Sequence, residues 1–137
     1  MTQIKDVMTQ NPTTCEPSTS VMEAARMMAS QDVGPLPVVE NSRLVGVVTD
    51  RDLVLRVLAE GRDPKATTVG EVASKDIVSV APETTLDEAL GLLARHQVRR
   101  LPVVEGERLV GIVAQADVAR QGDDRETGRV VEEISKP

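Results

Sequence analysis

The chain has 137 residues, of which 40% are hydrophobic, and it contains no Phe, Tyr or Trp. This length suffices for one compact domain or a tight pair of half-domains, whose core must be aliphatic. The net charge of -6 and the lack of aromatic rings for base stacking argue against nucleic-acid binding. The single cysteine, Cys15, excludes an internal disulfide, and no apolar run approaches the roughly 20 residues of a membrane span. We therefore expect a cytoplasmic protein without membrane contact.

Local signals in the first half of the chain predict a strand–helix–strand–strand–helix unit. The hydroxyl of Ser20 followed three residues later by Glu23 is a capping-box pattern at the start of a helix. Gly61 stands where a second helix is expected to end. In chain order we expect a helical turn at 4–8, an extended stretch at 12–15, an amphipathic helix from residue 21, a hairpin of strands 36–39 and 44–48 with a three- or four-residue turn, and a helix at 53–60.

The second half of the chain repeats the first. Residues 7–53 and 72–118 align at a constant offset of 65 without a gap, and 18 of the 47 pairs are identical, where residue usage predicts about three. We predict an α+β fold in which two βαββα copies pack about a pseudo-two-fold axis and leave a cleft between them. The expected parts are a first repeat at 1–61, a linker at 62–68, a second repeat at 69–120 and a charged C-terminal tail at 121–137.

The repeated pattern resembles a known family. The block Leu-Pro-Val-Val at 36–39 and 101–104, followed by the segment Gly-Val-Val-Thr-Asp-Arg-Asp at 46–52, is similar to the tandem CBS-domain pair, or Bateman module. The chain looks like a small stand-alone bacterial CBS protein. The resemblance implies a sensor, usually a homodimer, that binds AMP, ADP, ATP or S-adenosylmethionine between the repeats. It implies no required cofactor, and the downstream protein partner is unknown.

The resemblance also assigns residues to the ligand. Thr49 and Asp52 would contact the ribose, because a carboxylate can accept bonds from both vicinal hydroxyls. A second, weaker site is expected at Asp117, where Ala114 replaces the threonine. The remaining assignments are Ile77 and Val78 beside the adenine, Arg99 and Arg100 on the phosphates, and Thr13 and Thr14 bordering a base in the weaker site.

Other interpretations of these residues stay open. Thr49 and Asp52 also match a helix capping box, and the paired arginines fit solvated charges at a helix–strand junction. A ligand-free structural or protein-interaction dimer is the alternative function. With one His and one Cys, no nucleophilic catalytic set is plausible, and no metal-ligand spacing is present. We therefore expect no enzymatic activity.

Overall fold

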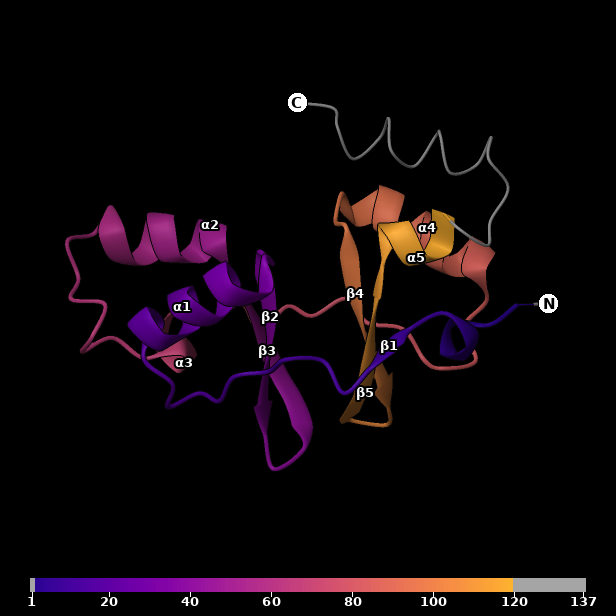
Figure 1. Cartoon of the computed structure of the whole chain (residues 1–137), viewed down its shortest axis with the longest axis horizontal. Helices are drawn as coiled ribbons and strands as arrows, with labels where there is room; N and C mark the ends of the chain where they lie inside the picture. The colour runs from indigo at the N-terminus through magenta and orange to yellow at the C-terminus, as the bar shows by residue number, and fades with distance from the viewer. Residues whose placement is uncertain (1, 120–137) are drawn as a thin grey trace. The chain divides into compact units, whose positions relative to one another are not determined.

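The computed structural model describes residues 2–119, which form two compact units (Figure 1). One unit is Thr13–Ile77, and the other combines the segment up to Pro12 with the chain from Val78 onward. Each unit mixes helices with a β-hairpin, as the α+β prediction requires. The expected C-terminal tail at 121–137 lies outside the described residues.

The two units share a similar order of elements, each with one long helix and one β-hairpin. The unit Thr13–Ile77 holds α1 (Val21–Gln31), β2 (Pro35–Glu40), β3 (Arg43–Thr49), α2 (Asp50–Leu53), a π-helical continuation η2 (Val54–Leu58) and α3 (Val69–Val72). The other unit holds the 3-10 turn η1 (Ile4–Asp6), β1 (Thr9–Gln10), α4 (Leu86–His96), β4 (Arg100–Glu105), β5 (Arg108–Ala114) and α5 (Gln115–Ala119).

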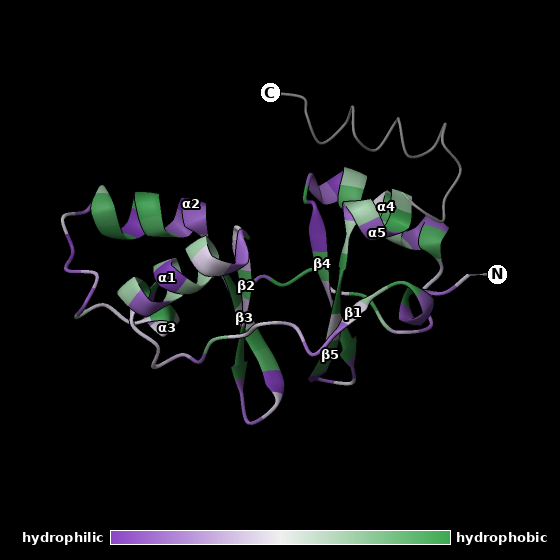
Figure 2. Cartoon of the chain, in the orientation of Figure 1, coloured by the Kyte–Doolittle hydropathy of each residue, from purple (hydrophilic) through white to green (hydrophobic). Residues whose placement is uncertain are grey.

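Helix α1 begins at the predicted cap, and α4 begins at the equivalent position of the second repeat. The Ser20 hydroxyl accepts a hydrogen bond from the Glu23 amide at 3.1 Å, and the Thr85 hydroxyl accepts one from the Glu88 amide at 3.3 Å. Each cap satisfies an amide that has no partner inside the helix. The apolar side of each long helix faces a core that is aliphatic in both units. The hairpin strands add hydrophobic residues to each core (Figure 2).

The two hairpins are built alike, and their turns are shorter than expected. Each hairpin has a register shift at the same place, after Val38 in one and after Val103 in the other. Strand pairing continues to Glu40↔Arg43, so only Asn41 and Ser42 form the first turn, and both have positive φ. Two residues with positive φ match the right-handed twist of the flanking strands. The extended stretch predicted at 12–15 forms only a single bridge to its hairpin, between Cys15 and Val38, and Val80 forms the equivalent bridge to Val103.

Helix α2 begins three residues earlier than expected. Thr49 caps it, so the helix includes Asp50 and continues through η2. It ends at Leu58, two residues before the predicted end, and Gly61 closes the turn that follows. Gly61 has φ 68°, and the Arg62 amide donates to the Val57 carbonyl at 2.9 Å. This bond, together with that from the Gly61 amide to the Leu58 carbonyl, forms a Schellman motif.

Each repeat begins with a short helical element, η1 or α3, and these lead-in turns are exchanged between the repeats. The Ile4 amide donates to the Thr84 carbonyl at 2.8 Å, and the Val69 amide, 65 residues later, donates to the Thr19 carbonyl at 2.8 Å. Ile4 and Val69 are both fully buried, each in the core built by the other repeat. The compact units are therefore offset from the sequence repeats 1–61 and 69–120.

The segment 62–68, expected as a linker, also contributes to the fold of its unit. The carbonyls of Thr67 and Pro64 accept hydrogen bonds from the Val21 and Met22 amides at 2.9 and 3.0 Å. These are the first amides of α1, which the helix itself leaves unpaired. Thr67 is buried, so this segment completes the N-terminus of α1 from outside the helix.

A glycine in each hairpin permits the close approach of the segment that follows a lead-in turn. Ser74 exchanges both backbone hydrogen bonds with Val47, and Thr9 pairs with Ile112 in the equivalent place. A Cβ atom on Gly46 would lie 2.9 Å from the Ser74 carbonyl oxygen. A Cβ atom on Gly111 would lie 2.9 Å from the Thr9 carbonyl oxygen. The identity of these glycines in both repeats therefore has a direct steric cause.

Candidate functional site

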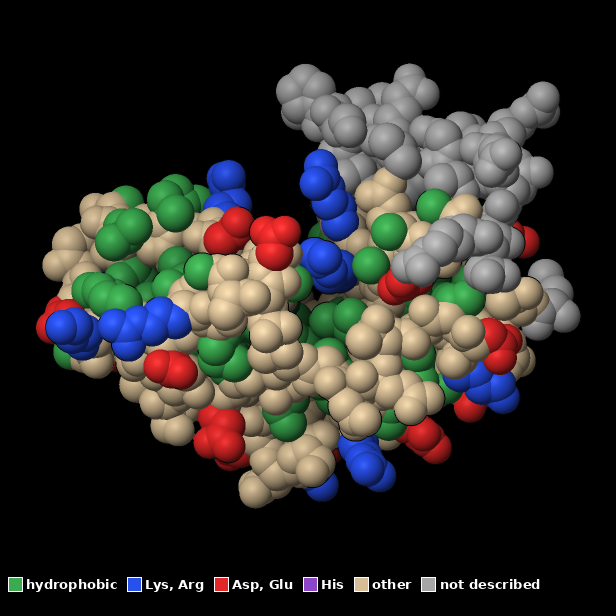
Figure 3. Space-filling view, in the orientation of Figure 1, with side chains coloured by type: hydrophobic (Ala, Val, Ile, Leu, Met, Phe, Trp, Pro, Cys, Tyr) green, Lys and Arg blue, Asp and Glu red, His purple; other side chains and the backbone are tan. Residues whose placement is uncertain are grey.

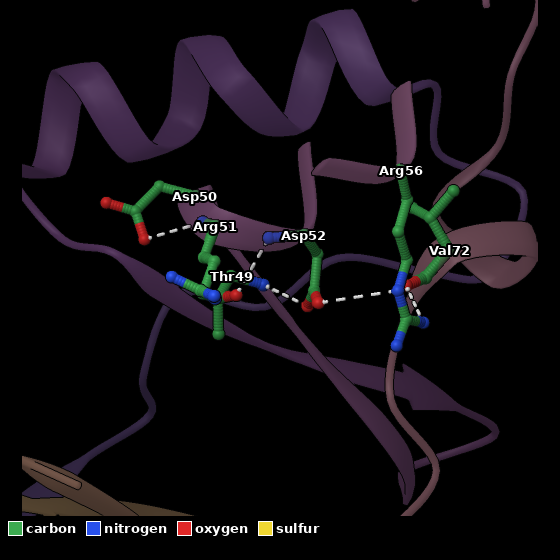
Figure 4. A network of polar contacts seen from close by, with 6 residues as sticks. All are labelled: Thr49, Asp50, Arg51, Asp52, Arg56 and Val72. Carbon is green, nitrogen blue, oxygen red and sulfur yellow. Dashed lines mark hydrogen bonds and ion pairs between the residues drawn. The ribbon is translucent and has the colours of Figure 1, made fainter. Parts of the chain in front are cut away.

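Thr49 and Asp52 form a reciprocal capping box at the start of α2 (Figure 4). The Thr49 hydroxyl accepts from the Asp52 amide at 3.1 Å, and the Thr49 amide donates to Asp52 Oδ2 at 2.9 Å. Each residue thus satisfies a backbone amide of the other. The capping interpretation of this motif is therefore correct, and it accounts for one of the two carboxylate oxygens.

The second oxygen of Asp52 keeps hydrogen-bonding capacity. The guanidinium of Arg56 forms an ion pair with Asp52, but its Nε lies 3.9 Å from Oδ1, too far for a hydrogen bond. The Asp52 side chain is 16% exposed, so solvent reaches the carboxylate. An ionised carboxylate offers about four lone-pair positions. The arrangement can therefore cap the helix and accept a hydroxyl donor at the same time.

Asp50 fixes the start of α2 against Gly34, the residue that precedes β2. Its amide donates to the Gly34 carbonyl at 3.0 Å, and its Oδ1 accepts from the Arg51 amide at 3.0 Å. A Cβ atom on Gly34 would lie 3.1 Å from Asp50 Oδ1. A side chain at position 34 would therefore press on this carboxylate.

The other unit keeps half of the capping box. Asp117 Oδ2 accepts from the Ala114 amide at 2.8 Å, in the same way that Asp52 accepts from Thr49. Ala114 has no hydroxyl to return the bond. The Gln115 amide donates to the Arg99 carbonyl at 2.7 Å, which is the counterpart of the Asp50–Gly34 bond. The backbone geometry of the motif is thus retained where the hydroxyl is lost.

The structure places the predicted ligand residues in both units. Thr49 and Asp52 contact each other within Thr13–Ile77. Arg99 lies beside the start of α5 in the other unit through its backbone carbonyl. Of the rest, Thr13, Thr14 and Ile77 belong to the unit Thr13–Ile77, whereas Val78, Arg100 and Asp117 belong to the other. Thr13 and Arg99 are exposed, and Thr14, Ile77, Val78, Arg100 and Asp117 are half-buried.

Sequence reasoning missed Arg56. Its Nη1 donates to the Val72 carbonyl at 2.9 Å while its Nε faces Asp52 (Figure 4). The spacing of Asp52 and Arg56, four residues apart on a helix, was the signal that could have found the first contact. The contact with Val72 had no sequence signal, because it joins residues 16 positions apart.

Cys15 is a buried core residue. Its Sγ donates to the Pro37 carbonyl at 3.7 Å. Burial raises the pKa of the Cys15 thiol to about 11. Because the thiolate is the reactive form, we expect this thiol to react slowly at neutral pH.

Among residues 2–119 there is no group of three or more His, Cys, Asp or Glu placed to hold a metal ion. Within the same residues, no helix has the length and apolar character needed to cross a membrane.

Comparison with known proteins identifies the repeats. The family model described as "CBS domain" matches residues 4–59 and 69–123. CBS domain-containing protein YhcV of Bacillus subtilis is 44% identical over 136 residues, which cover 98% of this chain and 96% of that protein. Hypoxic response protein 1 of Mycobacterium tuberculosis is 38% identical over 138 residues, covering all of this chain and 96% of that protein.

Solved structures match the fold. The crystal structure of hypoxic response protein I with two coordinated zinc ions superimposes with a TM-score of 0.81 at 41% identity, covering 89% of this chain and all of that one. The crystal structure of CBSX2 in complex with AMP gives a TM-score of 0.77 at 34% identity, covering 88% of this chain and 96% of that one. The predicted α+β fold with tandem CBS repeats is confirmed. The chain belongs to the CBS-domain family, as a tandem pair like those of the small stand-alone CBS proteins.

Proposed function

We propose that this protein is a regulatory module that binds an adenosine-containing ligand and has no catalytic activity. The observation that carries the proposal is the Asp52 carboxylate, which is held by the Thr49 amide through one oxygen and keeps the other for a donor. A related CBS protein, CBSX2, was crystallised with AMP. A ribose presents two vicinal hydroxyl donors, which suit an oriented carboxylate acceptor.

The remaining ligand contacts follow the family assignment and stay predictions. Ile77 and Val78 would flank the adenine with aliphatic surface, because the chain has no aromatic ring to stack on it. Arg99 and Arg100 would bind phosphate oxygens, for which a guanidinium has matching geometry. Asp117 with Thr13 and Thr14 would form the weaker site, since Ala114 lacks the hydroxyl that Thr49 supplies.

We also propose that the protein acts in the cytoplasm as a homodimer with a downstream protein partner. The support for association is an apolar surface on α2 and η2. Val54, Leu55 and Leu58, all in η2, are 51%, 46% and 65% exposed, and hydrophobic side chains gather over the part of the helix that continues from α2 in Figure 3. Large aliphatic side chains that stay exposed in a cluster mark an interaction surface.

A ligand titration tests the proposed function. Thermal unfolding would be followed with AMP, ADP, ATP and S-adenosylmethionine on the wild type, Asp52→Asn and Asp117→Asn. A ligand at a hundredfold excess over its Kd stabilises the fold by about 2.7 kcal/mol. We expect one of these ligands to raise the wild-type midpoint, Asp52→Asn to remove the rise and Asp117→Asn to leave most of it.

The choice of asparagine separates ligand binding from folding. Its amide oxygen can still accept the Thr49 amide, so the helix cap is retained while the charge is lost. If no ligand raises the wild-type midpoint at millimolar concentration, the nucleotide hypothesis fails and the alternative of a ligand-free interaction module stands. If Asp117→Asn removes the rise and Asp52→Asn does not, the two sites are assigned in reverse.

A further inference from the structure

Arg56 connects the candidate ribose carboxylate to the end of helix α3. Its Nε lies 3.9 Å from Asp52 Oδ1, and its Nη1 donates to the carbonyl of Val72 at 2.9 Å. Val72 is the last residue of α3, where the helix leaves its carbonyls unpaired. Figure 4 shows the Arg56 guanidinium next to both the carboxylate and the Val72 carbonyl. The same cation therefore faces two acceptors from different elements of one unit.

The position of Arg56 leaves the carboxylate available to a ligand. At 3.9 Å the guanidinium attracts Oδ1 by charge without occupying it through a hydrogen bond. Oδ2 is held on its other side by the Thr49 amide. The carboxylate is thus fixed from two directions, while Oδ1 keeps lone pairs for an incoming hydroxyl.

The contact with Val72 also reaches the segment that precedes the expected adenine residue. Two residues after Val72, Ser74 exchanges backbone hydrogen bonds with Val47 at 2.9 and 3.0 Å. Ile77 follows three residues later in the same unit. Arg56 and Val47 therefore anchor the start of the segment that carries Ile77.

We propose that Arg56 is a positioning residue that orients Asp52 toward a ribose hydroxyl. The inference rests on the proposed function and deepens it, because it assigns the ribose preference of the site to a residue that does not itself touch the ligand. Through Val72, the same residue makes the ribose contact depend on the docking of α3. Loss of the Arg56 charge should therefore weaken ribose recognition in particular.

The experiment compares two probes on matched variants. Isothermal titration calorimetry would measure the affinities of AMP and of 2′,3′-dideoxy-AMP for the wild type, Arg56→Gln and Arg56→Lys. Glutamine keeps a donor for the Val72 carbonyl but removes the charge, and lysine keeps the charge without the planar fork. Arg26→Ala is the control, because it removes the same charge from an exposed position on α1 of the same unit.

The expected result is a change in the ratio of the two affinities. In the wild type, loss of the ribose hydroxyls should weaken binding at least about tenfold, as expected for hydrogen bonds to a charged group. Arg56→Gln should weaken AMP about fivefold and leave the dideoxy probe nearly unchanged, so the ratio falls about fivefold. Arg56→Lys should restore the ratio to within about twofold of the wild type, and Arg26→Ala should not alter it.

Three other outcomes are possible, and each would refute a different claim. A merely structural role would weaken both probes equally in Arg56→Gln and leave the ratio unchanged, which would refute the inference alone. Equal binding of both probes by the wild type would refute the ribose assignment of Asp52 and the inference with it. If neither AMP nor its dideoxy analogue binds the wild type, the AMP form of the proposed function fails, and the role of Arg56 falls with it.

Discussion

Substitution of Gly46 by alanine tests the steric explanation of the repeated glycines. The added Cβ would lie 2.9 Å from the Ser74 carbonyl oxygen and 3.5 Å from the Ala73 Cβ. Ordinary van der Waals contact begins at 3.4 Å, so the carbonyl must move by about half an ångström. That carbonyl accepts the Val47 amide at 3.0 Å, so the movement lengthens a backbone hydrogen bond.

We expect Gly46→Ala to lower the free energy of unfolding, because the added methyl group overpacks the contact with Ser74. Inserted methyl groups in packed regions cost roughly 1–3 kcal/mol, and the backbone carbonyl that meets this Cβ cannot rotate away like a flexible side chain. We expect a loss of about 2 kcal/mol in the free energy of unfolding, or roughly 8 °C in the unfolding midpoint for a chain of this size.

Urea denaturation followed by circular dichroism measures this loss, with Gly91→Ala as the control. Gly91 lies in α4 with open space around its Cβ position. Alanine in an exposed helix interior is more favourable than glycine by about 1 kcal/mol. The two substitutions should therefore act in opposite directions. Equal or greater stability of Gly46→Ala relative to the wild type would refute the close-approach explanation.

Three further predictions concern single residues. Because burial raises the pKa of Cys15 from 9.0 to about 11, the native thiol should react with iodoacetamide at pH 8 about a hundredfold more slowly than the urea-unfolded chain; equal rates would contradict the burial. The Thr68 amide, the Thr68 hydroxyl and Arg62 lower the pKa of Glu71, so any stability that Glu71 adds is present above the unfolded-state pKa and lost as pH falls through the lower folded value. Urea unfolding of Glu71→Gln should then differ from the wild type more at pH 7 than at pH 3, and a larger difference at pH 3 would reverse the sign. Gly61→Ala should lower the free energy of unfolding by about 1 kcal/mol, because Gly61 adopts φ 68° in the Schellman motif; an unchanged urea midpoint would show that the turn tolerates a side chain.

The secondary structure was predictable because its signals are local. The hydroxyl–glutamate spacing after Ser20 and Thr85 marks the start of each long helix, and the caps form as expected. β-branched runs in both repeats form the hairpins. The helix after Thr49 was placed three residues late, because the apolar pattern begins only at Leu53 while the cap is already polar.

The exchange of the lead-in turns was not predictable from one sequence. Ile4 and Val69 stand in equivalent local patterns, and nothing in the neighbouring residues says whether each packs on its own repeat or on the other. Only the tertiary hydrogen bonds to Thr84 and Thr19 decide this. A duplicated sequence offers two equivalent surfaces, so burial of an apolar turn is satisfied by either one.

The contact between Thr49 and Asp52 was predictable from the sequence, but the role of the pair was not. The sequence placed a hydroxyl and a carboxylate at Thr49 and Asp52, and the structure brings them into contact. The same groups suit both the observed helix cap and the proposed ribose site, because both need a hydrogen-bond acceptor that is held in place. Sequence patterns therefore cannot separate the two roles, and they do not show the contact of Arg56 with Val72, which lies 16 positions away.

A crystal structure of this protein grown with AMP is the most direct test of the ribose assignment. We predict a ribose hydroxyl within hydrogen-bond distance of Asp52 Oδ1, with the Thr49 amide still donating to Oδ2. A nucleotide bound with its ribose away from Asp52, or a Thr49–Asp52 capping box that opens to admit the ligand, would contradict it.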